Sequence, residues 1–191
     1  MNETNKHLLI EKQIIDISNF QLNGKILDIG GGGEGIIELY KGKQVVAIDR
    51  SKRELEEAPD NSSLKIVMDA KELMFLDNTF DTVTAFYTLM YVPLNNHKII
   101  LQEIHRVLKS DGEFVLWELK IPNRGDRKQE FYGLYLEVKI KDRIVETGYG
   151  THWQDKEQNL QYFIDLVKDI GFQVKEQHEK EHTFYIRFIK K

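Results

Sequence analysis

The stretch ILDIGGGGEGII at residues 26–37 constrains the fold of this chain more than any other part of it. Residues 26–29 are apolar apart from one acid and predict a short strand, and four glycines, Gly30 to Gly33, follow it directly. Ile36 and Ile37 then begin a helix. A strand, a glycine turn and a helix in this order open an α/β fold of the nucleotide-binding type. The glycines predict a turn with positive φ whose backbone a ligand can approach, because a side chain would block that approach.

The same loop resembles motif I of the class I S-adenosylmethionine (SAM)-dependent methyltransferases. In that motif an acid and one further residue precede G-x-G-x-G, and Asp28, Gly30 and Gly32 match it. Glu34 stands where the third glycine is expected, and Gly35 comes next. Read with Gly35, the spacing is also G-x-G-x-x-G, which is the dinucleotide fingerprint. NAD therefore stays open as an alternative ligand.

The charge of the loop favours SAM over NAD. A dinucleotide places its pyrophosphate at a helix N-terminus, where backbone N–H groups and the helix dipole attract anions. Glu34 would repel that anion. SAM has no phosphate and carries a sulfonium and an ammonium, which suit the acids Asp28 and Glu34.

Two later apolar runs each end in an acid. Residues 44–48, QVVAI, lead to Asp49, about 20 residues beyond the loop, where a carboxylate can accept hydrogen bonds from ribose hydroxyls. The alternative is that Asp49 only caps a helix at residues 51–58. Residues 64–68 lead to Asp69 in the same way, and position alone leaves a structural role open.

Further blocks downstream resemble the same methyltransferases. Residues 72–83, ELMFLDNTFDTV, resemble the family's apolar loop, Asp-Asn turn and entry into strand four. Residues 102–118, QEIHRVLKSDGEFVLWE, resemble its helix, Asp-Gly turn and strand five. The resemblance implies that the glycine loop contacts the methionine part of SAM, Asp49 the ribose, and Asp69 with Ala70 the adenine. The SAM contacts that it implies are Asp28, Gly30, Gly31, Gly32, Asp49, Arg50, Asp69, Ala70 and Phe86.

The resemblance also implies a Rossmann-like α/β fold, built on a doubly wound, mostly parallel seven-stranded sheet. In that family the seventh strand lies between the fifth and the sixth. Residues 172–177 and 183–189 predict the closing antiparallel strand pair, which dinucleotide-binding folds lack.

Helices are predicted at both ends of the chain. A helix over residues 4–18, within an N-terminal segment 1–20, is predicted from three residues at helical spacing, Ile10, Ile14 and Ile17. Asp155 is predicted to cap a helix whose apolar stripe runs from Leu160 to Ile170.

Residues 131–150 predict a β-hairpin inserted after strand five. Apolar residues alternate along Leu134, Leu136, Val138 and Ile140, and the pattern resumes after a charged break at residues 141–143. The hairpin begins at the carboxyl edge of the sheet, where open α/β folds bind ligands. It is therefore interpreted as a wall of the substrate pocket, with a purely structural or a dimer-forming hairpin as the alternatives.

No residue is singled out as a catalytic base. Methyl transfer from a sulfonium is an in-line displacement with a good leaving group, so proximity and orientation supply much of the acceleration. A base is needed only if the acceptor must lose a proton. The substrate-binding candidates at the carboxyl edge of the sheet are Tyr91, Glu118, Tyr149 and His152. Two other histidines, His97 and His105, are expected at the surface.

Composition excludes several other classes of protein. The net charge is −4, which argues against a nucleic-acid-binding surface. The absence of cysteine excludes disulfides and cysteine zinc sites. HEKEH at residues 178–182 fits the zinc pattern H-E-x-x-H but bridges two strand-like segments, so a solvated turn without metal is predicted. No apolar run approaches the ~20 residues of a membrane span, and a cytoplasmic location is expected.

The chain, residues 1–191, is therefore expected to form a single SAM-binding domain that methylates a small molecule. Two alternatives from other classes remain. One is an NAD-dependent oxidoreductase. The other is a SAM-binding sensor or partner protein without catalysis, whose cofactor motifs would look the same.

Overall fold

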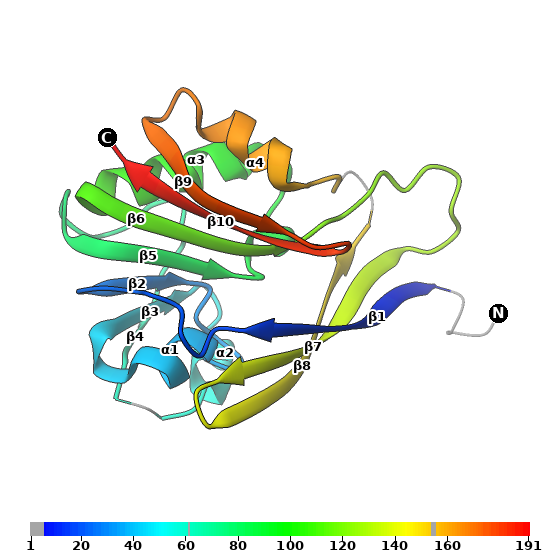
Figure 1. Ribbon diagram of the computed structural model, residues 1–191, viewed down its shortest axis with the longest axis horizontal. Coiled ribbons are helices and arrows are strands. Elements are labelled where there is room, and N and C mark those ends of the chain that lie inside the picture. Colours follow the sequence, from blue (N-terminus) through cyan, green and yellow to red (C-terminus); the bar gives the residue numbers. More distant parts are fainter. Residues whose placement is uncertain (1–5, 61, 154–155) are drawn as a thin grey trace.

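The computed structural model describes residues 6–60, 62–153 and 156–191, and it contains two sheets (Figure 1). The larger sheet has seven strands in the order β4-β3-β2-β5-β6-β10-β9, and the smaller has three in the order β1-β7-β8. The strands are β1 His7–Asp16, β2 Ile26–Ile29, β3 Val45–Asp49, β4 Leu64–Val67, β5 Phe80–Phe86, β6 Leu108–Leu119, β7 Phe131–Ile140, β8 Arg143–His152, β9 Phe172–Glu179 and β10 Thr183–Lys190.

The larger sheet is parallel except at one position. Strands β4, β3, β2, β5 and β6 are parallel to their neighbours, and β10 lies between β6 and β9 antiparallel to both. The central strand β2 is buried along its whole length, as expected of a parallel strand with both faces covered. This arrangement, with helices on the sheet, confirms the predicted Rossmann-like α/β fold.

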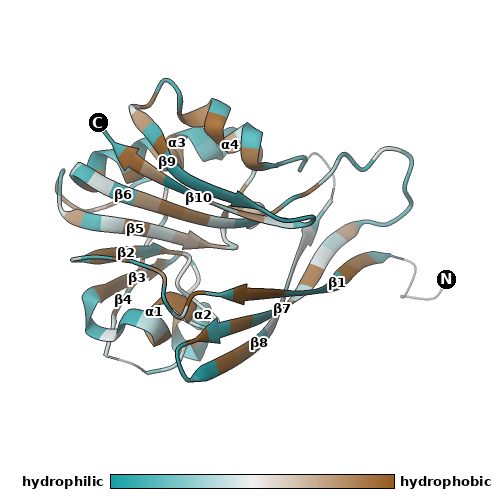
Figure 2. Cartoon of the chain, in the orientation of Figure 1, coloured by the Kyte–Doolittle hydropathy of each residue, from teal (hydrophilic) through white to brown (hydrophobic). Residues whose placement is uncertain are grey.

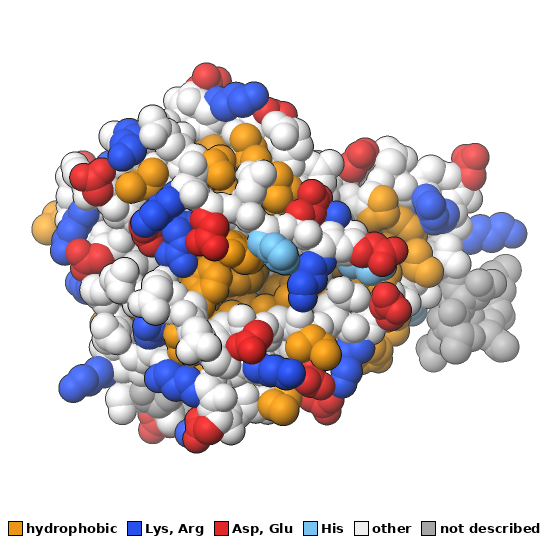
Figure 3. Space-filling model, viewed as in Figure 1, with side chains coloured by type: hydrophobic (Ala, Val, Ile, Leu, Met, Phe, Trp, Pro, Cys, Tyr) orange, Lys and Arg blue, Asp and Glu red, His pale blue; other side chains and the backbone are white. Residues whose placement is uncertain are grey.

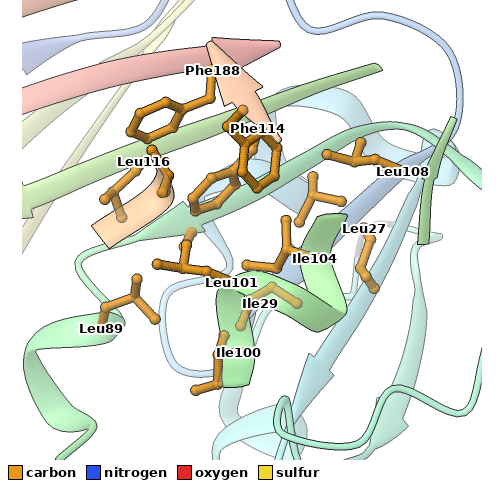
Figure 4. Packing of buried hydrophobic residues seen from close by; sticks show 14 of the residues in the cluster. Leu27, Ile29, Leu89, Ile100, Leu101, Ile104, Leu108, Phe114, Leu116 and Phe188 are labelled. Carbon is orange, nitrogen blue, oxygen red and sulfur yellow. The ribbon is translucent and has the colours of Figure 1, made fainter. Parts of the chain in front are cut away.

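The hydrophobic core consists of two clusters, one on each face of the larger sheet, and the helices cover both. The helices are α1 Ile36–Lys41, α2 Lys52–Glu57, α3 Leu94–Val107 and α4 Leu160–Val167, with short 3-10 turns η2 Gly42–Gln44 and η3 Leu89–Tyr91. One cluster joins the sheet to α3 and α4, and Figure 4 shows Ile100, Leu101 and Ile104 of α3 packed against Leu27 and Ile29 of β2. The alternate residue Ile26 turns to the other face, where it packs in a cluster with α1 and the three-stranded sheet.

The predicted N-terminal helix is wrong over the residues that the structure describes. Residues 7–16 form β1, which pairs in parallel with β7, while residues 4 and 5 of the predicted helix lie outside the described residues. A strand forms because Leu8 and Ile10 face inward and a register shift after Ile10 brings Ile15 to the same face. Ile14, which the helical stripe would have buried, is 46% exposed. Figure 2 shows apolar segments along this strand.

The segment predicted as a hairpin, residues 131–150, forms β7 and β8, which are antiparallel. It is not an isolated hairpin, because β1 completes it as a third strand. Its inward side chains, Leu134, Leu136, Val138 and Ile140, are buried in the same cluster as Ile36, Ile37 and Tyr40 of α1. The small sheet therefore covers the α1 face of the larger one and is part of the core.

The helix predicted near the C-terminal end of the sequence is present but begins later than predicted. The helix predicted to begin at Asp155 is α4, whose N-cap is Asn159, and Asp155 itself lies outside the described residues.

In the part of the chain that the structure describes, no helix has the length and apolarity that a membrane crossing requires. Acidic and basic side chains are interspersed over the face shown in Figure 3, with hydrophobic side chains gathered in a hollow near its centre.

Candidate functional site

A cavity of about 990 Å³ opens at the carboxyl ends of β2, β3, β4 and β5. This is the edge at which open α/β sheets bind ligands, and the volume suits a small organic molecule. The predicted SAM contacts that line it are Gly30, Gly32, Asp49, Arg50, Asp69, Ala70 and Phe86. Strand ends that are distant in sequence thus bring seven of the nine predicted residues to one cavity.

The glycine loop is held close to its neighbours. The N–H groups of Gly30 and Gly31 both donate to the carbonyl of Ile48 in β3, at 2.8 and 3.0 Å. Gly30 has φ 72°, and a Cβ there would lie 2.3 Å from the Thr88 side chain. Because both the conformation and the contact exclude a side chain, glycine is required here for the packing of the loop as well as for access by a ligand.

Asp28 and Gly31, the other two predicted contacts, lie behind the loop. Asp28 is buried and accepts a hydrogen bond of 2.5 Å from the Thr84 hydroxyl. It points toward α1 because side chains alternate along β2, and a Cβ on Gly31 would lie 2.9 Å from its Oδ2. Burial, reinforced by the nearby Glu38, raises the pKa of Asp28 well above its usual range. Asp28 therefore supports the loop from below.

Asp49 and Asp69 end neighbouring strands at the cavity. Oδ1 of Asp49 accepts a 2.7 Å hydrogen bond from the Ser51 N–H, and a Cβ on Gly32 would lie 3.2 Å from Oδ2. The alternative role as a helix cap is filled by Ser51, whose hydroxyl accepts from the Glu54 N–H. Asp69 is exposed and accepts a 2.9 Å hydrogen bond from the Lys71 N–H.

Aromatic residues form another part of the cavity wall. Tyr87, directly after β5, stacks on Tyr149 of β8 with ring centroids 5.3 Å apart and an interplanar angle of 13°. The Tyr91 hydroxyl accepts a 3.3 Å hydrogen bond from the Gly150 N–H. Burial raises the pKa of Tyr91 to about 12 and also raises that of Tyr149, so both phenols stay protonated at neutral pH. The structure thus places two of the four substrate candidates, Tyr91 and Tyr149, on the cavity wall.

The other two substrate candidates, Glu118 and His152, lie elsewhere. Glu118 is buried, accepts hydrogen bonds from Met90 N–H and Gln158 Nε2, and has a pKa raised to about 7 by desolvation. It supports η3 from beneath. The rings of His152 and Phe131 are tilted by 38° with centroids 4.1 Å apart. His152 is exposed on the outer face of β8, because strand alternation places it on the face opposite to Tyr149.

The predicted surface position of His97 is wrong. It is fully buried, and its Nε2 lies 3.0 Å from the Leu89 carbonyl and 3.2 Å from that of Val92. Two carbonyl partners require Nε2 to carry the proton, so Nδ1 accepts the hydroxyl of Tyr162 at 3.0 Å. Burial lowers the pKa of His97, which favours this neutral form. His97 therefore ties η3, the turn that carries Tyr91, to α3 and α4.

Several cavity residues were not predicted as contacts. Tyr87 and Thr88 follow Phe86, and the rule that ligands bind beyond the carboxyl ends of strands would have indicated them. Glu34 lines the cavity and binds Thr147 and Tyr149 of β8, a pairing that no local pattern shows. Among the described residues that line the cavity, carboxylates outnumber cations, so its field favours a cationic ligand: they are Glu34, Asp49, Glu54, Glu57 and Asp69 against Arg50 and Lys71.

The H-E-x-x-H pattern is divided between a strand and a turn. His178 belongs to β9 and is exposed, while His182 follows the strand. Ligand atoms of His182, Glu181 and Glu11 lie within 4.8 Å of one another at the surface, away from the cavity lining. Exposed acidic groups often gather in this way without a metal.

The sequence is similar to known methyltransferases. A family model described as "Methyltransferase domain" matches residues 27–116. The demethylmenaquinone methyltransferase of Thermotoga maritima is 32% identical over 165 residues, which are 78% of this chain and 70% of that protein. The enzyme of the same name from Staphylococcus aureus is 34% identical over 140 residues, which are 68% of this chain and 57% of that protein. This chain thus spans little more than half the length of the second relative.

Solved structures share the fold. A SAM-dependent methyltransferase from Methanosarcina mazei superimposes with a TM-score of 0.66 at 20% identity, covering 91% of this chain and 96% of its own. The PH0226 protein from Pyrococcus horikoshii gives a TM-score of 0.66 at 18% identity, covering 92% and 85%. At such identity the likeness concerns the fold alone, but the Thermotoga relative is similar in sequence over most of both proteins. From the glycine loop, the acid-tipped strands and this relationship together, the chain belongs to the class I SAM-dependent methyltransferases.

Proposed function

We propose that this enzyme transfers the methyl group of SAM to a small-molecule acceptor, and that SAM binds in the 990 Å³ cavity. The observation that carries the proposal is the meeting of Gly30, Asp49 and Asp69, from the ends of three adjacent strands, on one cavity. Gly30 and Gly32 would hold the methionine part, Asp49 the ribose hydroxyls, and Asp69 with Ala70 the adenine. Gly30 and Gly32 line the cavity, and the excess of carboxylates suits the positive charge of SAM.

The chain's contribution to the reaction is mainly orientation. When bound, SAM supplies an electrophilic methyl group on a sulfonium, which is already a good leaving group. Tyr87, Tyr91 and Tyr149 form a wall that can align a planar acceptor, which supplies the proximity that an in-line displacement needs. The phenols of Tyr91 and Tyr149 stay protonated at neutral pH and do not act as bases. The Tyr91 hydroxyl accepts from the Gly150 N–H and has its own proton left to donate to the acceptor, whereas the Tyr149 hydroxyl donates to Glu34.

The acceptor class is best approached through the relatives. Two of them are named demethylmenaquinone methyltransferase, so an aromatic quinol ring belongs in the first panel of acceptors. A tyrosine-rich wall beside the cavity is compatible with such a planar ring. We include an amine and a phenol as acceptors of other chemistry, and the transfer of a labelled methyl group to any of them is the measure of turnover.

The cofactor assignment is tested by calorimetric titration with SAM, S-adenosylhomocysteine and NAD. We expect micromolar affinity for the first two and no binding of NAD, because Glu34 would face a pyrophosphate with like charge. Binding of NAD in preference to SAM would contradict the proposal. SAM binding without turnover on any acceptor would favour the sensor alternative.

A change of Asp49 to Ala is expected to weaken SAM binding at least about tenfold. Removal of the carboxylate would remove charge-assisted hydrogen bonds to the ribose, which are worth ~1.5–3 kcal/mol. The matched variant Asp49→Asn keeps an acceptor for the Ser51 N–H and should weaken binding less. Thermal unfolding of both variants checks that the domain remains intact. Unchanged affinity in Asp49→Ala would mean that Asp49 serves only the turn at Ser51.

A further inference from the structure

Glu34 connects the glycine loop to a strand that follows it by more than a hundred residues. The hydroxyl of Thr147 donates to Oε1 of Glu34, and the hydroxyl of Tyr149 donates to Oε2 at 3.2 Å. Both donors belong to β8 of the small sheet. The carboxylate is therefore the point at which the small sheet is fastened to the loop.

The Glu34 carboxylate keeps part of its hydrogen-bonding capacity. Both partners are neutral hydroxyls, and in the described part of the chain no lysine or arginine forms an ion pair with Glu34. A carboxylate has about four lone-pair sites, and β8 fills two of them. Each oxygen of Glu34 can therefore accept one more hydrogen bond, and Glu34 lines the cavity.

Strand β8 is also fastened to the aromatic wall of the cavity. Tyr149 stacks on Tyr87 beyond β5, and the Gly150 N–H donates to the Tyr91 hydroxyl in η3. Val145, Gly148 and Tyr149 themselves line the cavity. Strand β8 thus spans from the glycine loop to the aromatic wall, and its position determines how far the cavity is closed.

We propose that Glu34 binds the α-ammonium group of SAM and, through the same carboxylate, holds β8 closed over the occupied cavity. This inference rests on the proposed function. An ammonium has N–H donors that can use the free lone pairs of Glu34, whereas a sulfonium has none. Because the two hydroxyls of β8 orient the carboxylate for the ammonium, closure of β8 and occupancy of the cavity strengthen each other, and this coupling is reciprocal.

The test compares three ligands on Glu34→Gln and on the wild-type chain. SAM and S-adenosylhomocysteine carry the ammonium, and 5′-methylthioadenosine lacks the amino acid part. We expect the variant to bind the first two at least about tenfold more weakly by calorimetry, and to bind 5′-methylthioadenosine within about twofold of the wild type. The matched control is Glu54→Gln, which removes a carboxylate from the same cavity without touching β8 and should affect all three ligands alike.

Hydrogen exchange supplies a readout that does not depend on activity. SAM should slow exchange of the amides of residues 145–150 in the wild-type chain, and should do so much less in Glu34→Gln. Thr147→Val keeps Glu34 but removes one hydroxyl, and it should lose part of this protection. This variant replaces Glu34→Gln as the test if Glu34→Gln folds poorly.

The outcomes separate this inference from the proposed function. Equal losses for all three ligands in Glu34→Gln, or full protection of residues 145–150 by SAM in that variant, would overturn the role of Glu34 alone. A wild-type chain that binds neither SAM nor S-adenosylhomocysteine would overturn the proposed function and this inference with it.

Discussion

Leu136→Ala is expected to lower the free energy of unfolding by about 2–5 kcal/mol, which is the usual cost of truncating a buried leucine. Leu136 is 0% exposed and lies on the inner face of β7, in the cluster that also contains Ile37 and Trp117. Such a loss is a large part of the ~5–15 kcal/mol that stabilises a typical domain. Urea denaturation followed by circular dichroism measures it, with the m-value as a check on two-state unfolding.

The preceding residue is the matched control. Tyr135 lies on the same strand but is 56% exposed and faces outward, so Tyr135→Ala should cost less than about 1 kcal/mol. Similar small effects of both changes would contradict the view that the small sheet is part of the core. Two separate transitions would show that the small sheet unfolds by itself.

Glu38→Gln is expected to make the protein more stable than the wild type above about pH 7. Glu38 is buried beside Asp28, and burial raises its pKa from 4.5 to about 7. Among the described residues neither of its carboxylate oxygens has a hydrogen-bond partner. Because the pKa is higher in the folded state, the unfolded state releases the proton first, and stability is lost as the pH rises from 4.5 through about 7.

The measurement is the difference in unfolding free energy between the variant and the wild type as a function of pH. Between pH 4.5 and pH 8 that difference should move in favour of Glu38→Gln by about 2–3 kcal/mol, since one pKa unit corresponds to ~1.4 kcal/mol. Glu56→Gln makes the same chemical change at an exposed site on α2, where Glu56 pairs with Lys52, and serves as the matched control. A difference no larger for Glu38→Gln than for Glu56→Gln would contradict the prediction.

The parts of the site that lie on parallel strands could be predicted from the sequence. Asp49 and Asp69 each follow a buried apolar run, and the carboxyl ends of parallel strands meet at one edge, so local patterns indicate a shared site. The same rule does not give the direction of a side chain. The side chain of Asp28 is buried beneath the loop, and that of Glu118 is enclosed by Met90 and Gln158, so neither lines the cavity.

The small sheet could be predicted only in part, because its pairing is not local. The spacing of Ile10, Ile14 and Ile17 fits a helix, and the register shift in β1 removes the alternation that would have indicated a strand. The partner of β1 lies more than a hundred residues away in β7. The contact between Glu34 and β8 also joins residues more than a hundred positions apart, so local sequence patterns do not predict it.

The pairing of β1 with β7 has a consequence for the way in which the chain is made. Residues 7–16 are synthesised more than a hundred residues before their partner at residues 131–140. At ribosomal rates of ~5–20 residues per second, the first strand waits roughly 6–25 s with its backbone and apolar side chains unpaired. During that interval the unpaired strand is open to a chaperone or to aggregation. The cavity therefore gains its last wall only after translation has passed residue 152.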